Sequence, residues 1–237
     1  MAWLLIFVAA TFIGGCSSSD DDPAGPSGDT PPEFNGSGTT VTVPTGMANS
    51  GDPMANQAIG FINMANGMSA HGGWFTPPSG MRAAEGSWEE SWSYEGMTVT
   101  LIVTETSTMY TWDVYIDGTI DDIVFDNHHF YHAWTTLDGS CVGLEFYAYD
   151  EFDGQLEWTW CTESDGTFTM SFIFGDYVDS FTIDILVNPD GSGEVDYAFN
   201  GTTVLFVSWD ALGNGEWWTY DESGNPTGND TWDAALN

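Results

Sequence analysis

The sequence predicts an all-β protein built as an antiparallel up-and-down meander of about 10–12 strands. From Trp88 onward, apolar and polar residues alternate with a period of two, as Val99, Leu101 and Val103 do between threonines. Turn dipeptides separate these runs: Asp117-Gly118, Asp138-Gly139, Asp153-Gly154, Asp165-Gly166, Asp190-Gly191, Asn200-Gly201 and Asn214-Gly215. Asp-Gly and Asn-Gly pairs between alternating strands are strong hairpin signals.

A meander of this size must curl, close or split into two sheets. Consecutive hairpins favour a closed, lipocalin-like barrel over a sandwich, although a transmembrane barrel would show the same alternation. We expect one β-barrel-like domain over residues 47–237. Barrels of more than about eight strands leave interior space that aromatic side chains, a ligand or a helix must fill.

One short helix is predicted before the strands, at about 53–68. Asp52 is placed to cap it, and Pro53 suits its first turn. Its apolar residues fall near one face at helical spacing: Met54, Ala58, Ile62 and Ala65. We expect this helix to cap or plug the barrel.

Cys141 and Cys161 are predicted to form a disulfide. A hairpin centred at Glu151 places the two cysteines opposite each other. The same register sets apolar residues against one another on one face: Val142 against Trp160, Leu144 against Trp158, and Phe146 against Leu156. Paired strands bring Cβ atoms to about 4.5–5.5 Å, which admits a disulfide.

The N-terminal segment indicates export. Residues 2–12 form an apolar run that is too short to span a membrane, and Ile13-Gly14-Gly15-Cys16 closes it. This stretch resembles the lipobox of bacterial lipoproteins, in which the cysteine is acylated. The resemblance implies a signal peptide at 1–15, a lipidated Cys16 and a Ser/Gly/Pro-rich tether at 16–46. The alternative is an N-terminal strand or single-pass anchor with an incidental cysteine.

The resemblance also implies a location. Ser17 after the cysteine is similar to lipoproteins sorted to an outer membrane, and the Ser/Asp run to residue 22 resembles the acidic export tag of surface-exposed Bacteroidetes lipoproteins. A plain solvated tether explains the same run. We expect an outer-membrane lipoprotein of the cell envelope.

The net charge is −35, and Arg82 is the only basic side chain. A surface of this sign excludes nucleic acid as a partner. It also limits membrane contact to the lipid anchor. The composition resembles that of proteins from salt-loving organisms, in which salt screens the repulsion. No Gly-x-Ser-x-Gly nucleophile motif is present, so we expect a non-enzymatic protein. We also expect a monomer without a cofactor.

The histidines after Asp126 are the main candidate site. On a regular strand His128 and His132 lie about 13 Å apart and His129 points to the other face, so no shared metal site is predicted without a local helix or bulge. On that strand Asp126, His128 and His132 share the side of the aromatic residues. A ligand pocket would then be lined by Asp126, His128, Phe130, His132, Trp134, Trp158 and Trp160. The alternative is a rim cluster or hydrogen-bonded core histidines.

Asn188, Asp190 and Ser192 stand where an EF-hand loop has its first calcium ligands. Position twelve is Phe199 instead of the bidentate glutamate that the motif requires. We therefore favour a hairpin turn here over a calcium site.

Two functions are compatible with this sequence. The first is binding of a small apolar or amphipathic ligand inside the barrel, carried by the aromatic-rich inward face. The second is a structural or adhesion module that contacts glycans or proteins through outer-face aromatic residues: Tyr115, Tyr147, Tyr149 and Trp218. A contiguous patch of exposed aromatic residues would favour the second.

Overall fold

The computed structural model describes residues 34, 40–69, 82–84, 87–94, 96–120, 123–147, 155–175 and 179–234. The signal-like segment, Cys16 and most of the expected tether lie outside these residues. Two helices come first, α2 (Thr45–Asn49) and α3 (Pro53–Ser69). The strands that follow are β1 (Arg82–Ala84), β2 (Ser87–Tyr94), β3 (Met97–Glu105), β4 (Met109–Ile120), β5 (Ile123–Thr136), β6 (Cys141–Tyr147), β7 (Gln155–Thr162), β8 (Phe168–Gly175), β9 (Ser180–Val187), β10 (Gly193–Phe199), β11 (Thr202–Trp209), β12 (Gly215–Tyr220) and β13 (Pro226–Trp232).

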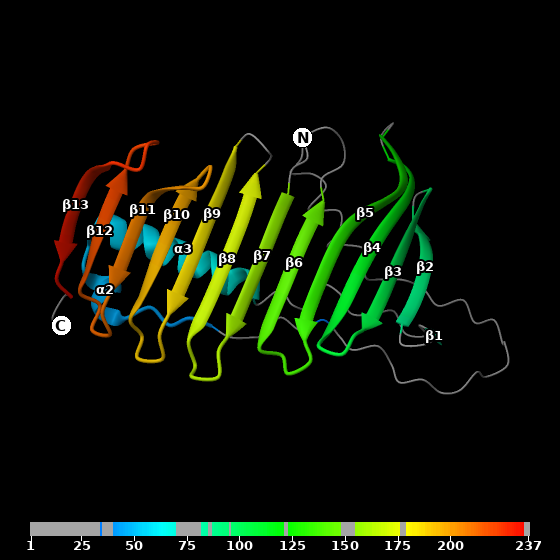
Figure 1. The fold of residues 1–237 in the computed structure, drawn as a ribbon, viewed down its shortest axis with the longest axis horizontal. Helices are drawn as coiled ribbons and strands as arrows, with labels where there is room; N and C mark the ends of the chain where they lie inside the picture. Colours follow the sequence, from blue (N-terminus) through cyan, green and yellow to red (C-terminus); the bar gives the residue numbers. More distant parts are fainter. Residues whose placement is uncertain are drawn as a thin grey trace.

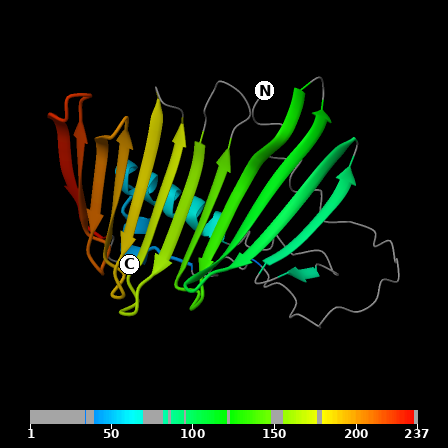
Figure 2. The same ribbon diagram turned by 45° about the vertical axis from the view of Figure 1, so that its right-hand side comes forward.

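All 13 strands form one antiparallel sheet in which each strand pairs with its neighbours in sequence (Figure 1). The predicted all-β meander is therefore confirmed. The sheet is open, with β1 at one edge and β13 at the other, whereas the sequence favours a closed barrel (Figure 2). Closure is one way to bury the apolar face of a sheet, and a covering layer is another. Here the N-terminal elements supply that layer.

Helix α3 confirms the predicted helix and covers one face of the sheet, which we call the helix-side face (Figures 1 and 2). Asp52 Oδ1 accepts hydrogen bonds from the backbone N–H groups of Met54 and Ala55, at 2.8 and 3.0 Å. One side of α3 is buried in the core, through Ala55, Ala58, Ile62 and Ala65. The three alanines are small and let the helix pack closely on the strands. The helix thus caps the sheet instead of plugging a barrel. No described helix is long and apolar enough to cross a membrane.

The helix-side face carries the core. Trp112, Val195 and Val207 are fully buried there with α3 residues in one cluster. Phe34, from the N-terminal segment, packs edge-on against Trp112 with ring centroids 5.1 Å apart. The opposite face, which we call the polar face, bears the alternating Thr, Ser, Asp and Glu side chains, and no described helix covers it (Figure 1).

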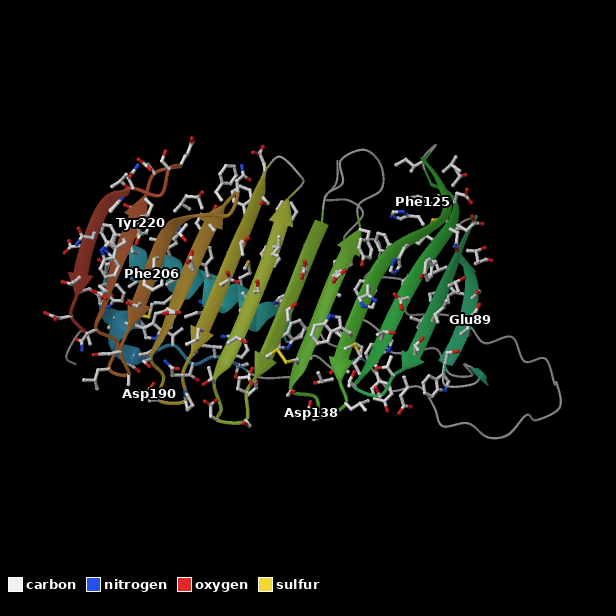
Figure 3. All side chains as sticks on the ribbon, viewed as in Figure 1. Glu89, Phe125, Asp138, Asp190, Phe206 and Tyr220 are labelled. Carbon is white, nitrogen blue, oxygen red and sulfur yellow. A yellow bond between two sulfur atoms is a disulfide. The ribbon has the colours of Figure 1, made fainter. Side chains whose placement is uncertain are left out.

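The Cys141–Cys161 disulfide joins β6 to β7, at the register expected from the sequence (Figure 3). Val142 pairs with Trp160 and Leu144 with Trp158, and all four side chains are buried on the helix-side face. The disulfide itself lies on the polar face, because cysteine and core residues alternate along both strands.

Five hairpin turns share one side-chain hydrogen bond. In these turns an aspartate Oδ1 accepts the backbone N–H of the residue two positions later, at 2.9–3.0 Å, in the pairs Asp138–Ser140, Asp165–Thr167, Asp190–Ser192, Asp210–Leu212 and Asp221–Ser223. Such local bonds hold tight turns. The calcium-like stretch is one of these hairpin turns: Asn188 N–H donates to Ser192 O, and Asp190 accepts from Ser192.

Candidate functional site

Two irregularities in β5 set the geometry of the polar face. Val114 on β4 pairs with Tyr131, whereas the next residue, Tyr115, pairs with His129, so Phe130 has no partner on β4. This is a β-bulge, in which one extra residue in a strand moves the side chains on one side of it to the opposite face of the sheet. A second shift lies near Asn127, which has a φ of 46° and donates its N–H to Asp117 Oδ1 at 3.3 Å.

The bulge brings His129 and His132 to the same face, where both meet Asp113. The carboxylate oxygen Oδ1 of Asp113 lies 2.9 Å from His129 Nε2 and 2.8 Å from His132 Nδ1. The three side chains are partly exposed, at 21% for Asp113, 34% for His129 and 24% for His132. We call these three residues the histidine–aspartate cluster.

Two tyrosines flank this cluster. The ring of Tyr115 stacks on His129 with centroids 4.6 Å apart and an angle of 18° between the ring planes. Tyr147 approaches His129 from β6, with centroids 4.7 Å apart. The imidazole of His129 is therefore held between two aromatic rings, which limits its rotation.

Carboxylates surround the cluster on the next two strands. Glu145 lies opposite His132, and Glu157 lies opposite Glu145. The hydroxyl of Tyr147 donates a hydrogen bond to Glu145 Oε2. Three acidic side chains, those of Asp113, Glu145 and Glu157, thus share a small area with the two imidazoles.

These contacts shift the pKa values of the cluster. The hydrogen bond to Asp113 raises the pKa of His132 above its ordinary value, and the charges of Asp113 and Glu145 act in the same direction, while burial opposes them. Burial alone would raise the pKa of Asp113, but hydrogen bonds and charges from both histidines outweigh it and lower the net value. Burial, with the nearby charge of Glu145, raises the pKa of Glu157.

A second feature of the polar face is a row of directly paired residues that crosses the strands. From β5 to β12 the partners are Trp134, Gly143, Thr159, Ser171, Asp184, Asp196, Phe206 and Trp218. Aromatic residues stand at both ends, and hydroxyls and carboxylates stand between them. Figure 3 labels Phe206 toward one end. We call this set the cross-strand row.

The middle of the row is hollowed. A shallow cavity of about 280 Å³ lies over β7–β10 and is lined by Thr159, Ser171, Asp184, Glu194 and Asp196, among others. Asp196 accepts a hydrogen bond from Thr203 through Oδ2, at 3.1 Å. Its Oδ1 is buried and has no hydrogen-bond partner among the described residues. Burial raises the pKa of Asp196; the hydrogen bond from Thr203 opposes this, and repulsion from Asp184 adds to it.

The structure separates the residues predicted to line a barrel pocket. His128 pairs with Ile116 and faces the helix side, whereas His132 pairs with Asp113 and faces the polar side. The prediction that His128 and His132 share one face is therefore wrong. Its Nε2 lies 3.2 Å from the carbonyl oxygen of Tyr147. The bulges reverse the alternation on which that expectation rested.

The aromatic members of the expected pocket also divide between the faces. Trp158 and Trp160 are buried in the core, with centroids 4.8 Å apart, and Phe130 packs near Phe146 at 6.1 Å. Asp126 is exposed. Trp134 lies on the polar face, where its ring covers Gly143 so closely that a Cβ there would come within 2.1 Å of the indole nitrogen.

Asp113 and the facing of His129 were missed by sequence reasoning. The strand lengths in the structure record the extra residues, because β4 has 12 residues and β5 has 14. In a hairpin whose strands pair along their whole length, two extra residues on one side imply two bulges. The sequence does not show where those bulges lie.

Comparisons with protein-family models, with curated proteins and with solved structures find no match.

Proposed function

We propose that this protein is a lipid-anchored cell-envelope protein that binds neutral glycans on the polar face of its sheet. The observation that carries the proposal is the cross-strand row, in which aromatic rings flank a hollow of hydroxyls and carboxylates. The proposal follows the second of the two functions compatible with the sequence.

The row matches the chemistry of an extended sugar chain. Sugar rings present apolar C–H faces that stack on aromatic side chains, and hydroxyls that hydrogen-bond to carboxylates and to Thr or Ser. Trp134 at one end, with Phe206 and Trp218 at the other, offers the stacking surfaces. Neighbouring strands are about 4.8 Å apart, a spacing close to the length of one hexose residue. A linear glycan lying across the strands would meet one side chain of the row per sugar.

The carboxylates at the hollow support this proposal. Asp184 and Glu194 line it beside Thr159 and Ser171. Sugar hydroxyls can donate to such carboxylate oxygens, while Asp196 Oδ2 accepts from Thr203.

Charge narrows the class of glycan. The chain carries a net charge of −35, and Asp184 faces Asp196 within the row. Uronate, sialate or sulfate groups would be repelled here, because no basic side chain stands among them to neutralise the charge. Neutral hexose polymers remain compatible.

The first function, binding inside a barrel, loses its support. The sheet is open, and the aromatic residues of the helix-side face pack against one another and against the N-terminal elements. A lipidated Cys16 would hold the protein at the membrane. The expected tether at 16–46 is shorter than predicted, because Phe34 and Val41 are buried in the core and α2 begins at Thr45. We expect the protein to act as a monomer.

A panel of immobilised neutral and acidic glycans, probed with the full-length protein in detergent, tests the proposal. Trp134→Ala and Trp218→Ala should each weaken binding about ten-fold, the scale of one aromatic contact. Phe174→Ala is the matched control, because Phe174 is 46% exposed but lies on the helix-side face. Failure to bind neutral glycans, or equal losses in all three variants, would contradict the proposal.

A further inference from the structure

We propose that Asp113, His129 and His132 form a binding site for a transition-metal dication, with Zn²⁺ the best-matched ion. The inference is independent of glycan binding. It begins from the bulge at Phe130, which places two imidazoles and one carboxylate on the same face of the sheet. Bulges are concentrated next to functional sites, where they re-aim side chains.

The donor set favours a borderline metal ion over calcium or magnesium. Imidazole nitrogens suit Zn²⁺, Cu²⁺, Fe²⁺ and Ni²⁺, whereas Ca²⁺ and Mg²⁺ prefer oxygen ligands. Two histidines with one carboxylate are a recurring set that leaves a coordination position for water or another ligand. Here that position faces the open side of the sheet, since all three side chains are partly exposed.

The geometry is close to that of a metal site. One ligand atom from each residue lies within 4.8 Å of the others. Zn²⁺ binds nitrogen and oxygen at about 2.0–2.2 Å, which puts tetrahedral ligand atoms roughly 3.3 Å apart. The contacts of Asp113 Oδ1 are 2.8 and 2.9 Å, so the ion would enter by widening two hydrogen bonds by about half an ångström.

The surroundings would hold the ligands and favour a dication. Tyr115 and Tyr147 confine the ring of His129, and groups that orient a ligand in this way strengthen metal sites. Glu145 and Glu157 add negative charge on the adjacent strands. A dication would offset repulsion among three carboxylates that a single basic residue elsewhere in the chain does not relieve.

Zn²⁺ titration of the full-length protein in detergent, after treatment with a chelator, tests the site. The buffer holds excess Mg²⁺, which occupies non-specific carboxylates on this acidic surface. One saturable Zn²⁺ site is expected by calorimetry. His129→Gln, His132→Gln and Asp113→Asn should each weaken it by at least about 100-fold, because losing a direct ligand costs more than losing a group that orients one.

His128→Gln is the matched control, because His128 is adjacent to His129 but faces the other side of the sheet. It should leave the affinity unchanged. A wild-type protein without a saturable Zn²⁺ site, or variants that bind as tightly as His128→Gln, would overturn the proposal and leave a hydrogen-bonded cluster only.

A spectroscopic measurement on the wild-type protein keeps the proposal testable if a variant does not fold. Added Zn²⁺ should shift the imidazole nitrogen NMR signals of His129 and His132 and leave those of His128 in place. Shifts at all three histidines, or at none, would count against the site. Co²⁺ in place of Zn²⁺ should give the visible absorption of a four-coordinate ion.

Discussion

The indole of Trp209 lies directly on Gly193, so that a Cβ at position 193 would come within 2.6 Å of the ring carbon Cζ2. The two residues are cross-strand partners on β11 and β10, and the indole Nε1 donates to Gly191 O at 2.9 Å. The next strands repeat the arrangement, with Trp232 over Gly215 and a 2.7 Å bond to Gly213 O. In both places the glycine leaves space for a tryptophan ring, which packs on it and donates a hydrogen bond to a carbonyl oxygen of the adjacent turn.

Gly193→Ala should lower the free energy of unfolding by about 1–3 kcal/mol, the usual cost of overpacking. The added methyl group meets both the ring of Trp209 and the carbonyl oxygen of Leu186, at 2.5 Å, and a backbone oxygen cannot rotate away. Urea unfolding monitored by tryptophan fluorescence measures the effect.

Gly60→Ala is the control for that substitution. Gly60 is exposed on α3, and no described atom beyond its own stretch of helix backbone lies within 4 Å of the place that an added methyl group would take. Alanine is the better helix former by roughly 1 kcal/mol, so this variant should gain stability. A Gly193→Ala variant as stable as the wild type would contradict the packing described for Trp209.

Removing the Cys141–Cys161 disulfide by Cys141→Ser with Cys161→Ser should cost about 2–4 kcal/mol of stability, since the bond closes a loop in the unfolded chain. The register of β6 and β7 should persist, because buried pairs such as Val142 with Trp160 hold it. Non-reducing peptide mapping identifies the bond, and denaturant unfolding measures its contribution. Two thiols that alkylate freely in the untreated protein would contradict it.

Asp138 should titrate at a pKa of about 2. The backbone N–H of Ser140 is the main cause, followed by the hydroxyls of Ser140 and Thr136, and all three favour the charged carboxylate. Because the folded pKa is below the ordinary value of 3.8, the contribution to stability is present above pH 3.8 and is lost as the pH falls through about 2. Carboxyl-carbon NMR follows the titration, and Ser140→Ala should move the pKa upward.

Cys16→Ser should release the protein from the membrane fraction and remove the added mass of acyl chains. With −35 net charge and one basic residue, the chain has no electrostatic attraction to anionic lipid. Fractionation and intact mass of the expressed protein test both points. A membrane-bound Cys16→Ser variant would contradict the lipid anchor.

Much of the fold follows from local chemistry that the sequence displays. Alternation and most Asp-Gly and Asn-Gly pairs predict the hairpins, although Asp117-Gly118 lies inside β4 and is not a turn. The cysteines with their apolar neighbours predict the register of β6 and β7. Asp52 predicts the start of α3. Each of these depends on residues that are close in sequence.

Sheet closure and the histidine site depend on contacts between residues that are far apart in the sequence. An apolar sheet face has the same alternation whether a second wall of a barrel or a helix such as α3 covers it. The bulge at Phe130 is a single displaced residue, yet it turns His129 toward His132 and leaves His128 on the other side. Regular alternation therefore predicts the wrong partner for His132.

The consecutive pairing of all 13 strands also makes the protein modular in length. Each strand depends on its two sequence neighbours, so contacts along the sheet are short-range in sequence, which favours rapid folding by stepwise addition of hairpins. Duplication or deletion of one hairpin would lengthen or shorten the sheet without rewiring the rest, as in repeat proteins. On a surface that engages an extended partner, such a change would alter the number of subsites while keeping each one intact.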